Sequence, residues 1–109
     1  MSRPTETPRE GLEPLRDAEV ADWLDARPRG ALFFWDAEDA VSQRQRARLE
    51  VVAAAAQMPV GVLDVRTDAL VASAVGVKSV PALVVFRGGE VAERILGAAP
   101  ESILKEALR

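Results

Sequence analysis

Hydrophobic residues are grouped into three short, nearly continuous runs, at residues 31–35, 60–65 and 80–86. Runs of this length and composition are typical of strands that are buried on both faces of a sheet. A fourth apolar segment, residues 91–96, follows the pair Gly88-Gly89, which favours a tight hairpin turn. The pattern therefore predicts a central sheet of about four strands, of which the last two are antiparallel.

Before, between and after these runs, apolar residues recur at three- and four-residue spacing, which predicts helices. The four predicted helices cover residues 17–27, 40–57, 68–75 and 100–108. Asp17 and Thr67 are expected to cap the first and third helices with their side-chain oxygens. Trp23 is expected in the core, because it shares one helix face with Val20 and Leu24. Strands and helices in this order predict an α/β fold, with a mixed sheet flanked by helices.

The N-terminal segment has a different composition from the rest of the chain. Residues 1–14 contain three prolines, one glycine, mixed charges and few apolar residues. Such a composition is typical of a flexible tail. The total length of 109 residues suits one compact domain. We therefore expect a flexible N-terminal tail over residues 1–14 and a single domain over residues 15–109.

Three chemically important residue types are missing: the sequence has no cysteine, no histidine and no tyrosine. Their absence excludes thiolate nucleophiles, imidazole bases, phenol acids and zinc sites of the Cys/His type. A serine could still pair with a lysine, but neither Lys78 nor Lys105 has a recognisable spacing to a serine. We therefore expect no catalytic residues, no metal site and no cofactor, and the protein is not expected to be an enzyme.

The charge balance limits the class of partner. The formal net charge is -3, whereas proteins that bind nucleic acid present clustered basic side chains. One basic cluster, Arg44, Arg46 and Arg48, is expected to fan out over a solvated helix face. No window has the roughly 18 apolar residues of a membrane span, and the N-terminus lacks the apolar region of a signal peptide. Neither nucleic acid nor membrane is expected as a partner, and the expected location is cytoplasmic.

One block of sequence, residues 75–91, carries a family resemblance. It contains, in order, Gly76, the pair Val80-Pro81, an apolar strand that ends in Phe86, and the hairpin Gly88-Gly89. This block resembles the thioredoxin superfamily, and the similarity extends over residues 17–109, with Gly97 matching the glycine after the last strand. The resemblance implies a thioredoxin-like fold and a cis peptide bond before Pro81.

The positions of the family's redox chemistry hold other residues here. Phe34-Trp35 resembles the Phe-Trp pair that precedes the family's Cys-x-x-Cys motif, and counting on without a gap places residues 39–42 at that motif. Asp39 and Ser42 thus stand where the two cysteines would be. Phe33 stands where the family has a buried acid that relays protons. The resemblance therefore identifies the chain as a redox-inactive member of the superfamily.

Peptide recognition in this family requires no thiol. Thioredoxins hold a substrate peptide by strand addition against the backbone of the residue before the cis-proline, which here is Val80. The candidate peptide-binding residues are Trp35, Asp36, Glu38, Asp39, Ser79, Val80 and Pro81. The three acidic residues among them have two interpretations, since they can stabilise the start of the following helix or attract a basic partner. Both roles are compatible with each other.

Three functional readings follow. The size of the chain, its Asp22-Trp23-Leu24 segment, the strand after Gly30 and the missing dithiol resemble a bacterial family of thioredoxin-like hydrogenase-maturation chaperones. That resemblance implies binding of the twin-arginine signal peptide of a hydrogenase small subunit. The first alternative is a generic protein-interaction or oligomerisation module with a redox-dead thioredoxin fold. A remote alternative is a glutathione-related enzyme.

Overall fold

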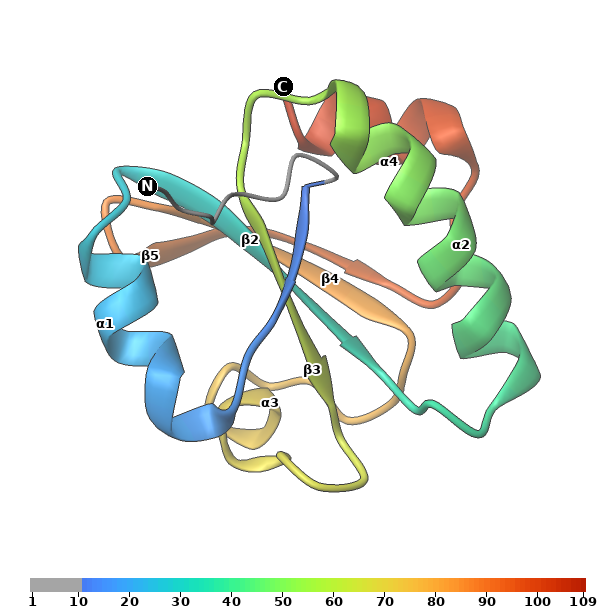
Figure 1. Ribbon diagram of the computed structural model, residues 1–109, viewed down its shortest axis with the longest axis horizontal. Coiled ribbons are helices and arrows are strands. Elements are labelled where there is room, and N and C mark those ends of the chain that lie inside the picture. Colours follow the sequence, from blue (N-terminus) through green and yellow to red (C-terminus); the bar gives the residue numbers. More distant parts are fainter. Residues whose placement is uncertain (1–10) are drawn as a thin grey trace, which may run out of the picture.

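A computed structural model describes residues 11–109 (Figure 1). The strands are β1 (Leu12–Pro14), β2 (Arg29–Trp35), β3 (Val60–Asp64), β4 (Ala82–Arg87) and β5 (Glu90–Leu96). The helices are α1 (Val20–Asp25), α2 (Ala40–Ala55), α3 (Leu70–Ala74) and α4 (Glu101–Ala107), with a 3₁₀ turn over Asp17–Glu19 before α1. The predicted order of elements is confirmed from Asp17 onward.

The strands form one mixed sheet in the order β1-β3-β2-β4-β5. β1 and β2 run parallel to β3, whereas β4 is antiparallel to both β2 and β5. The α/β fold and the mixed sheet are confirmed, but the sheet has five strands instead of about four. The additional strand, β1, lies within the segment predicted as a tail, whose residues 1–10 lie outside the described residues. Leu12 is buried there and pairs with Val60.

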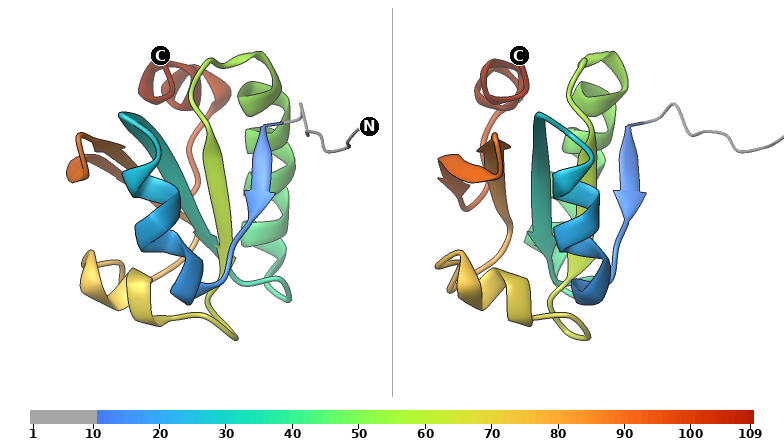
Figure 2. Two further views of the ribbon diagram at one scale, coloured as in Figure 1. Left: turned by 60° about the vertical axis from the view of Figure 1, so that its left-hand side comes forward. Right: turned by 90° about the vertical axis from the view of Figure 1, so that its left-hand side faces the viewer.

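Helices cover both faces of the sheet (Figure 2). α2 and α4 pack on the face that includes Phe33, Val62 and Leu83, while α1 and α3 pack on the opposite face. This arrangement buries β2, β3 and β4 on both sides, as their continuous apolar runs predicted. Trp23 is buried in α1 and its Nε1 donates to the Glu13 carboxylate at 2.9 Å, so the prediction that it belongs to the core is confirmed.

The strand directions bring several chain segments to one edge of the sheet. β2 and β3 both end at this edge because they are parallel, and β4 begins there because it is antiparallel to β2. β5 ends beside the start of β4, and four residues connect the end of β2 to the start of α2. We refer to this side as the peptide edge, after the peptide-binding residues that the sequence analysis predicted there. It includes the connection from β2 to α2 and the loop that precedes β4.

The caps predicted for α1 and α3 differ from those in the structure. The Asp17 carboxylate accepts hydrogen bonds from the N–H groups of Leu70 and Val71, both at 3.0 Å, and so caps α3 from a distant part of the chain. Asp68, in turn, accepts at 2.8 Å from the backbone N–H of Asp17. Thr67 does not cap α3, because its hydroxyl donates to the Asp68 carboxylate instead. The two loops thus hold each other by reciprocal hydrogen bonds.

This arrangement makes stability depend on pH. The pKa of Asp68 is lowered, first by the hydrogen bond from the Asp17 N–H and further by Thr67 and Arg16, which together outweigh burial. A lowered folded-state pKa contributes stability above the unfolded-state pKa, and this contribution is lost as pH falls through the folded-state value. Asp68→Asn should therefore lower the midpoint of thermal unfolding by several degrees at pH 7.

The difference between Asp68→Asn and the unmodified chain should shrink as the pH is lowered, because both chains then lack the charge. Differential scanning calorimetry between pH 7 and acidic pH measures it. Glu19→Gln is a suitable control, because Glu19 is an exposed carboxylate of the adjacent turn. An unfolding midpoint that is equal for Asp68→Asn and the unmodified chain at neutral pH would contradict the role assigned to the carboxylate.

Candidate peptide-binding site

The predicted site residues come together from two loops at the peptide edge. Trp35 ends β2, and Asp36, Glu38 and Asp39 form the connection to α2. Ser79, Val80 and Pro81 form the loop before β4. Val65, which follows β3, lies between the two groups: its N–H donates to the Trp35 carbonyl at 2.8 Å, and its side chain lines a groove together with Val80.

The peptide bond between Val80 and Pro81 is cis, as the family resemblance implied. The Pro81 carbonyl is already used, because it accepts from the N–H of Gly97 at 2.8 Å. By contrast, the N–H and carbonyl of Val80 take part in no hydrogen bond among residues 11–109. Val80 therefore offers one backbone donor and one backbone acceptor, which is what strand addition requires.

A groove of about 370 Å³ borders Val80 on the side of α3. Its lining includes the apolar residues Val65, Ala72 and Val77 and the polar residues Ser73, Lys78 and Ser79. An apolar floor beside unpaired backbone groups can receive the alternate side chains of an extended peptide. Ser79 and Lys78 are exposed at its rim.

Asp39 and Ser42 lie at the start of α2, at the positions that the sequence resemblance assigned to the dithiol. The Asp39 carboxylate accepts at 2.8 Å from the Ser42 N–H and so caps the helix. Ser42 is fully buried, and its Oγ accepts from the Asp36 N–H at 3.2 Å. The capping role considered for the acidic residues is thus confirmed for Asp39. A carboxylate at this helix terminus is favoured by the same dipole that favours a thiolate.

Arg66, which the sequence analysis did not single out, reduces the negative charge of the site. Its guanidinium lies 3.8 Å from the Asp36 carboxylate and 3.3 Å from that of Glu38. Asp64 positions the loop by accepting at 3.0 Å from the Arg66 N–H. The acidic face is therefore partly neutralised from within the chain. The sequence could have indicated that Arg66 belongs to the site, since it follows the end of a predicted strand at this same edge.

Trp35 is half-buried and packs against the core on the α2 and α4 face. The guanidinium carbon of Arg46 lies 4.6 Å from the centre of its ring, which is a cation–π distance. Arg48 donates at 2.8 Å to the carbonyl of Ala99. The prediction that Arg44, Arg46 and Arg48 fan out over a solvated face is therefore wrong for two of the three, because only Arg44 is exposed, whereas Arg46 and Arg48 are half-buried.

Two apolar side chains at the peptide edge were missed by the sequence analysis. Val41, in the first turn of α2, is 41% exposed, and Leu96, the last residue of β5, is 60% exposed. Leu96 pairs with Ala82, directly after the cis-proline. The sequence could have indicated Leu96, because it is the apolar residue immediately before Gly97. Both side chains enlarge the apolar surface that a bound segment could cover.

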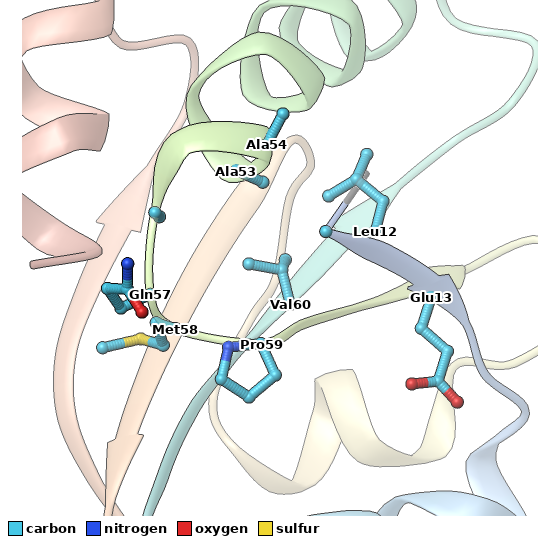
Figure 3. Close-up of a pocket in the computed structure, with 10 residues that line it drawn as sticks. Leu12, Glu13, Ala53, Ala54, Gln57, Met58, Pro59 and Val60 are labelled. Atoms are coloured by element: carbon cyan, nitrogen blue, oxygen red, sulfur yellow. The ribbon is translucent and has the colours of Figure 1, made fainter. Parts of the chain in front are cut away.

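A second hollow, of about 300 Å³, lies at the opposite end of the sheet, between β1 and the end of α2 (Figure 3). Its lining is mostly small and apolar, and its polar side chains, Glu13 and Gln57, lie on opposite sides of it (Figure 3). Glu13 is already engaged by Trp23. The polar groups of this hollow therefore do not converge on one point where a ligand could bind.

Within residues 11–109 no group of three or more carboxylates is placed to hold a metal ion, and no helix is long and apolar enough to cross a membrane.

Both the sequence and the fold of this chain can be compared with those of known proteins. No protein-family model matches the sequence, and no curated protein matches it. The fold is similar to the solved structure of a mutant thioredoxin from Halobacterium salinarum NRC-1, with a TM-score of 0.84, 25% sequence identity, and coverage of 95% of this chain and 93% of that one. None of the comparisons supports assignment to the hydrogenase-maturation family. The chain is thioredoxin-like in fold, and it carries no cysteine at the positions of the redox motif or anywhere else.

Proposed function

We propose that this protein is a non-catalytic, thioredoxin-like binding protein that receives an extended segment of a partner protein at the peptide edge. The observation that carries the proposal is the backbone of Val80, whose N–H and carbonyl are unpaired among the described residues and border an apolar groove. Strand addition uses these two groups directly. It needs neither a thiol nor a cofactor.

The chemistry of the site supports a partner segment with apolar and basic side chains. Leu96 and Val41 offer exposed apolar area, while Asp36 and Glu38 supply negative charge at the same edge. Arg66 competes for those carboxylates, so a basic ligand must share or displace it. The first ligand to test is the twin-arginine signal peptide of a hydrogenase small subunit, because arginine can pair with carboxylates in bidentate geometry.

Isothermal titration with this signal peptide tests the proposal, beside a peptide in which both arginines are replaced by lysine. We expect micromolar or tighter binding, with the lysine peptide weaker. Val80→Asp should weaken binding of the arginine peptide by at least about tenfold, because it places a charge in the apolar groove. Val51→Asp is the matched control, since Val51 is 63% exposed on α2, away from the groove.

Charge variants distinguish the contribution of the acidic residues to peptide binding from that of the groove beside Val80. Asp36→Asn together with Glu38→Gln should weaken binding of the arginine peptide about two- to tenfold, whereas Arg66→Ala should strengthen it. Asp39→Asn is preferable to Asp39→Ala, because asparagine keeps the helix cap while removing the charge. Absence of binding to both peptides would reject the signal-peptide ligand. Binding that Val80→Asp leaves unchanged would reject the groove itself.

The second candidate function is the generic interaction or oligomerisation module. It is favoured by the exposure of Leu70, which is 76% accessible on α3 beside a groove of about 830 Å³. Val51, which is 63% exposed, lies on α2 and so on the opposite face of the sheet. The two therefore form no common patch. Sedimentation velocity with Leu70→Ser would distinguish this function, since self-association through α3 would be lost in that variant.

A further inference from the structure

A third surface lies at the opposite end of the sheet from the peptide edge. There the C-terminal ends of α2 and α4 lie side by side (Figures 1 and 2), and Arg29 at the start of β2 lines the same groove. A groove of about 540 Å³ opens between them. It is lined by Arg29, Val52, Ala55, Ala56, Gln57, Lys105, Leu108 and Arg109, which we name the basic groove.

The basic groove combines an apolar floor with positive charge. Ala55 and Ala56 provide the accessible part of the floor, above the buried side chains of Val52 and Leu108, and Arg29, Lys105 and Arg109 provide the charge. The first two of these basic side chains form no salt bridge or hydrogen bond among residues 11–109, while Arg109 pairs with Glu106 at 3.0 Å. In a chain whose formal net charge is -3, such a local excess of positive charge is unexpected.

A pair of like charges adds to this excess. Arg29 lies directly opposite Arg87 in the antiparallel pairing of β2 with β4. Strand alternation places both on the face covered by α2 and α4, because Ala31 and Val85, two residues further along each strand, are buried in that core. Like charges at directly opposed positions are destabilising. Glu90, opposite Arg87 on β5, makes no salt bridge with it within the described part of the chain.

We propose that the basic groove binds an acidic, amphipathic segment of a partner protein, in which glutamate or aspartate side chains flank one or two large apolar residues. The apolar residues would cover Ala55 and Ala56, which are the accessible apolar residues of the groove, and the carboxylates would meet Arg29 and Lys105. Charge complementarity of this kind raises the association rate and selects the partner. The site is independent of the peptide edge, so the protein would bridge two partners from opposite ends of one sheet.

Nuclear magnetic resonance titration of the full ¹⁵N-labelled chain tests the proposal. The probe is an acetylated and amidated hexapeptide with a leucine–phenylalanine pair flanked on each side by two glutamates, and its control has glutamine in place of every glutamate. We expect shift changes at the amides of Val52, Ala55 and Leu108, and none at Val80. Binding should weaken in about 0.5 M salt, because exposed charges are then screened, and the glutamine peptide should bind at least about fivefold more weakly.

A double variant tests whether Arg29 and Lys105 provide the positive charges that bind the acidic peptide. Arg29→Gln with Lys105→Gln should weaken binding of the acidic peptide about tenfold, since it removes two exposed ion pairs. Arg44→Gln with Arg94→Gln is the matched control, because it removes two positive charges from exposed positions that line neither the basic groove nor the groove beside Val80. Equal weakening in both double variants, shift changes centred on Val80, or no shift changes would overturn the proposal.

Two further measurements separate other occupants of the basic groove. Binding to vesicles of anionic phospholipid without binding to the acidic peptide would overturn the proposal in favour of a membrane surface. A sedimentation coefficient that rises with concentration, and falls to the monomer value in the Arg29→Gln and Lys105→Gln variant, would overturn it in favour of a second copy of this chain. Failure at this groove leaves the peptide edge untouched, because the titrations at Val80 use different residues and a basic peptide.

Discussion

Replacing Phe33 by aspartate should lower the free energy of unfolding by about 5 kcal/mol. Truncating a buried phenylalanine costs about 3–5 kcal/mol, and a carboxylate without a partner adds a desolvation penalty. Phe33 is 1% exposed, and its registered neighbours on β3 and β4 are Val62 and Leu83, which are also buried. None of these side chains can donate a hydrogen bond to the introduced carboxylate. Because domains of this size are stable by roughly 5–15 kcal/mol, a large fraction of the variant should be unfolded.

Chemical denaturation followed by circular dichroism measures this effect, and Phe33→Leu is the control. The leucine keeps the position apolar, so it should cost less than about 1.5 kcal/mol. In the thioredoxins that this chain resembles, a buried acid stands at the position of Phe33. The aspartate and leucine variants therefore test whether the interior around Phe33 is purely apolar. Equal stability of the aspartate and leucine variants would show that the Phe33 site admits water or a charge partner. The assignment of a dry core between α2 and the sheet would then be wrong.

The central strands were predictable from the sequence because their side chains are buried on both faces. Such strands leave a continuous apolar signal, and β2, β3 and β4 all have it. β1 has no such signal. It spans three residues, of which only Leu12 is buried, while Glu13 and Pro14 are exposed. Its pairing with β3 is a tertiary interaction, and no local pattern in residues 1–14 indicates it.

The helix caps show the same limit. A side-chain oxygen just before a helix predicts a local cap, and this holds for Asp39 at α2. For Asp17 and Asp68 the partners are about fifty residues apart in the chain, and each carboxylate serves the other's loop. Sequence spacing contains no information about such a contact. Only the crossing of the two loops on the α1 and α3 side of the sheet brings them together.

The location of the candidate site was predictable, but its charge was not. The family resemblance placed Val80 and the acidic residues at one edge, and the strand directions account for that placement. The neutralising contacts of Arg66 depend on side-chain reach across two loops. The same holds for Arg46, whose position over Trp35 replaces the predicted solvated arrangement. Long basic side chains were the least predictable part of the site, because they can point to solvent or fold back.

Restoring two cysteines should restore a disulfide. In the Asp39→Cys and Ser42→Cys double variant, the thiols would stand three residues apart in the first turn of α2, where residue 39 already caps the N–H of residue 42. A helix N-terminus lowers the pKa of a thiol and increases its thiolate fraction. We therefore expect two free thiols after reduction and none after exposure to oxidised glutathione, as counted by thiol titration in denaturant. The oxidant is released as two molecules of reduced glutathione, so the intact mass of the oxidised protein should show no glutathione adduct.

The single variants serve as controls and test the asymmetry of the turn. Asp39 is partly exposed whereas Ser42 is fully buried, so Asp39→Cys alone should react readily with a thiol reagent in the folded protein, and Ser42→Cys alone should react slowly. If both thiols of the double variant persist under oxidising conditions, the first turn of α2 differs from that of the redox-active family. If the disulfide forms, the backbone of this turn can support a dithiol, and only its side chains distinguish it from the redox motif of the thioredoxins that it resembles.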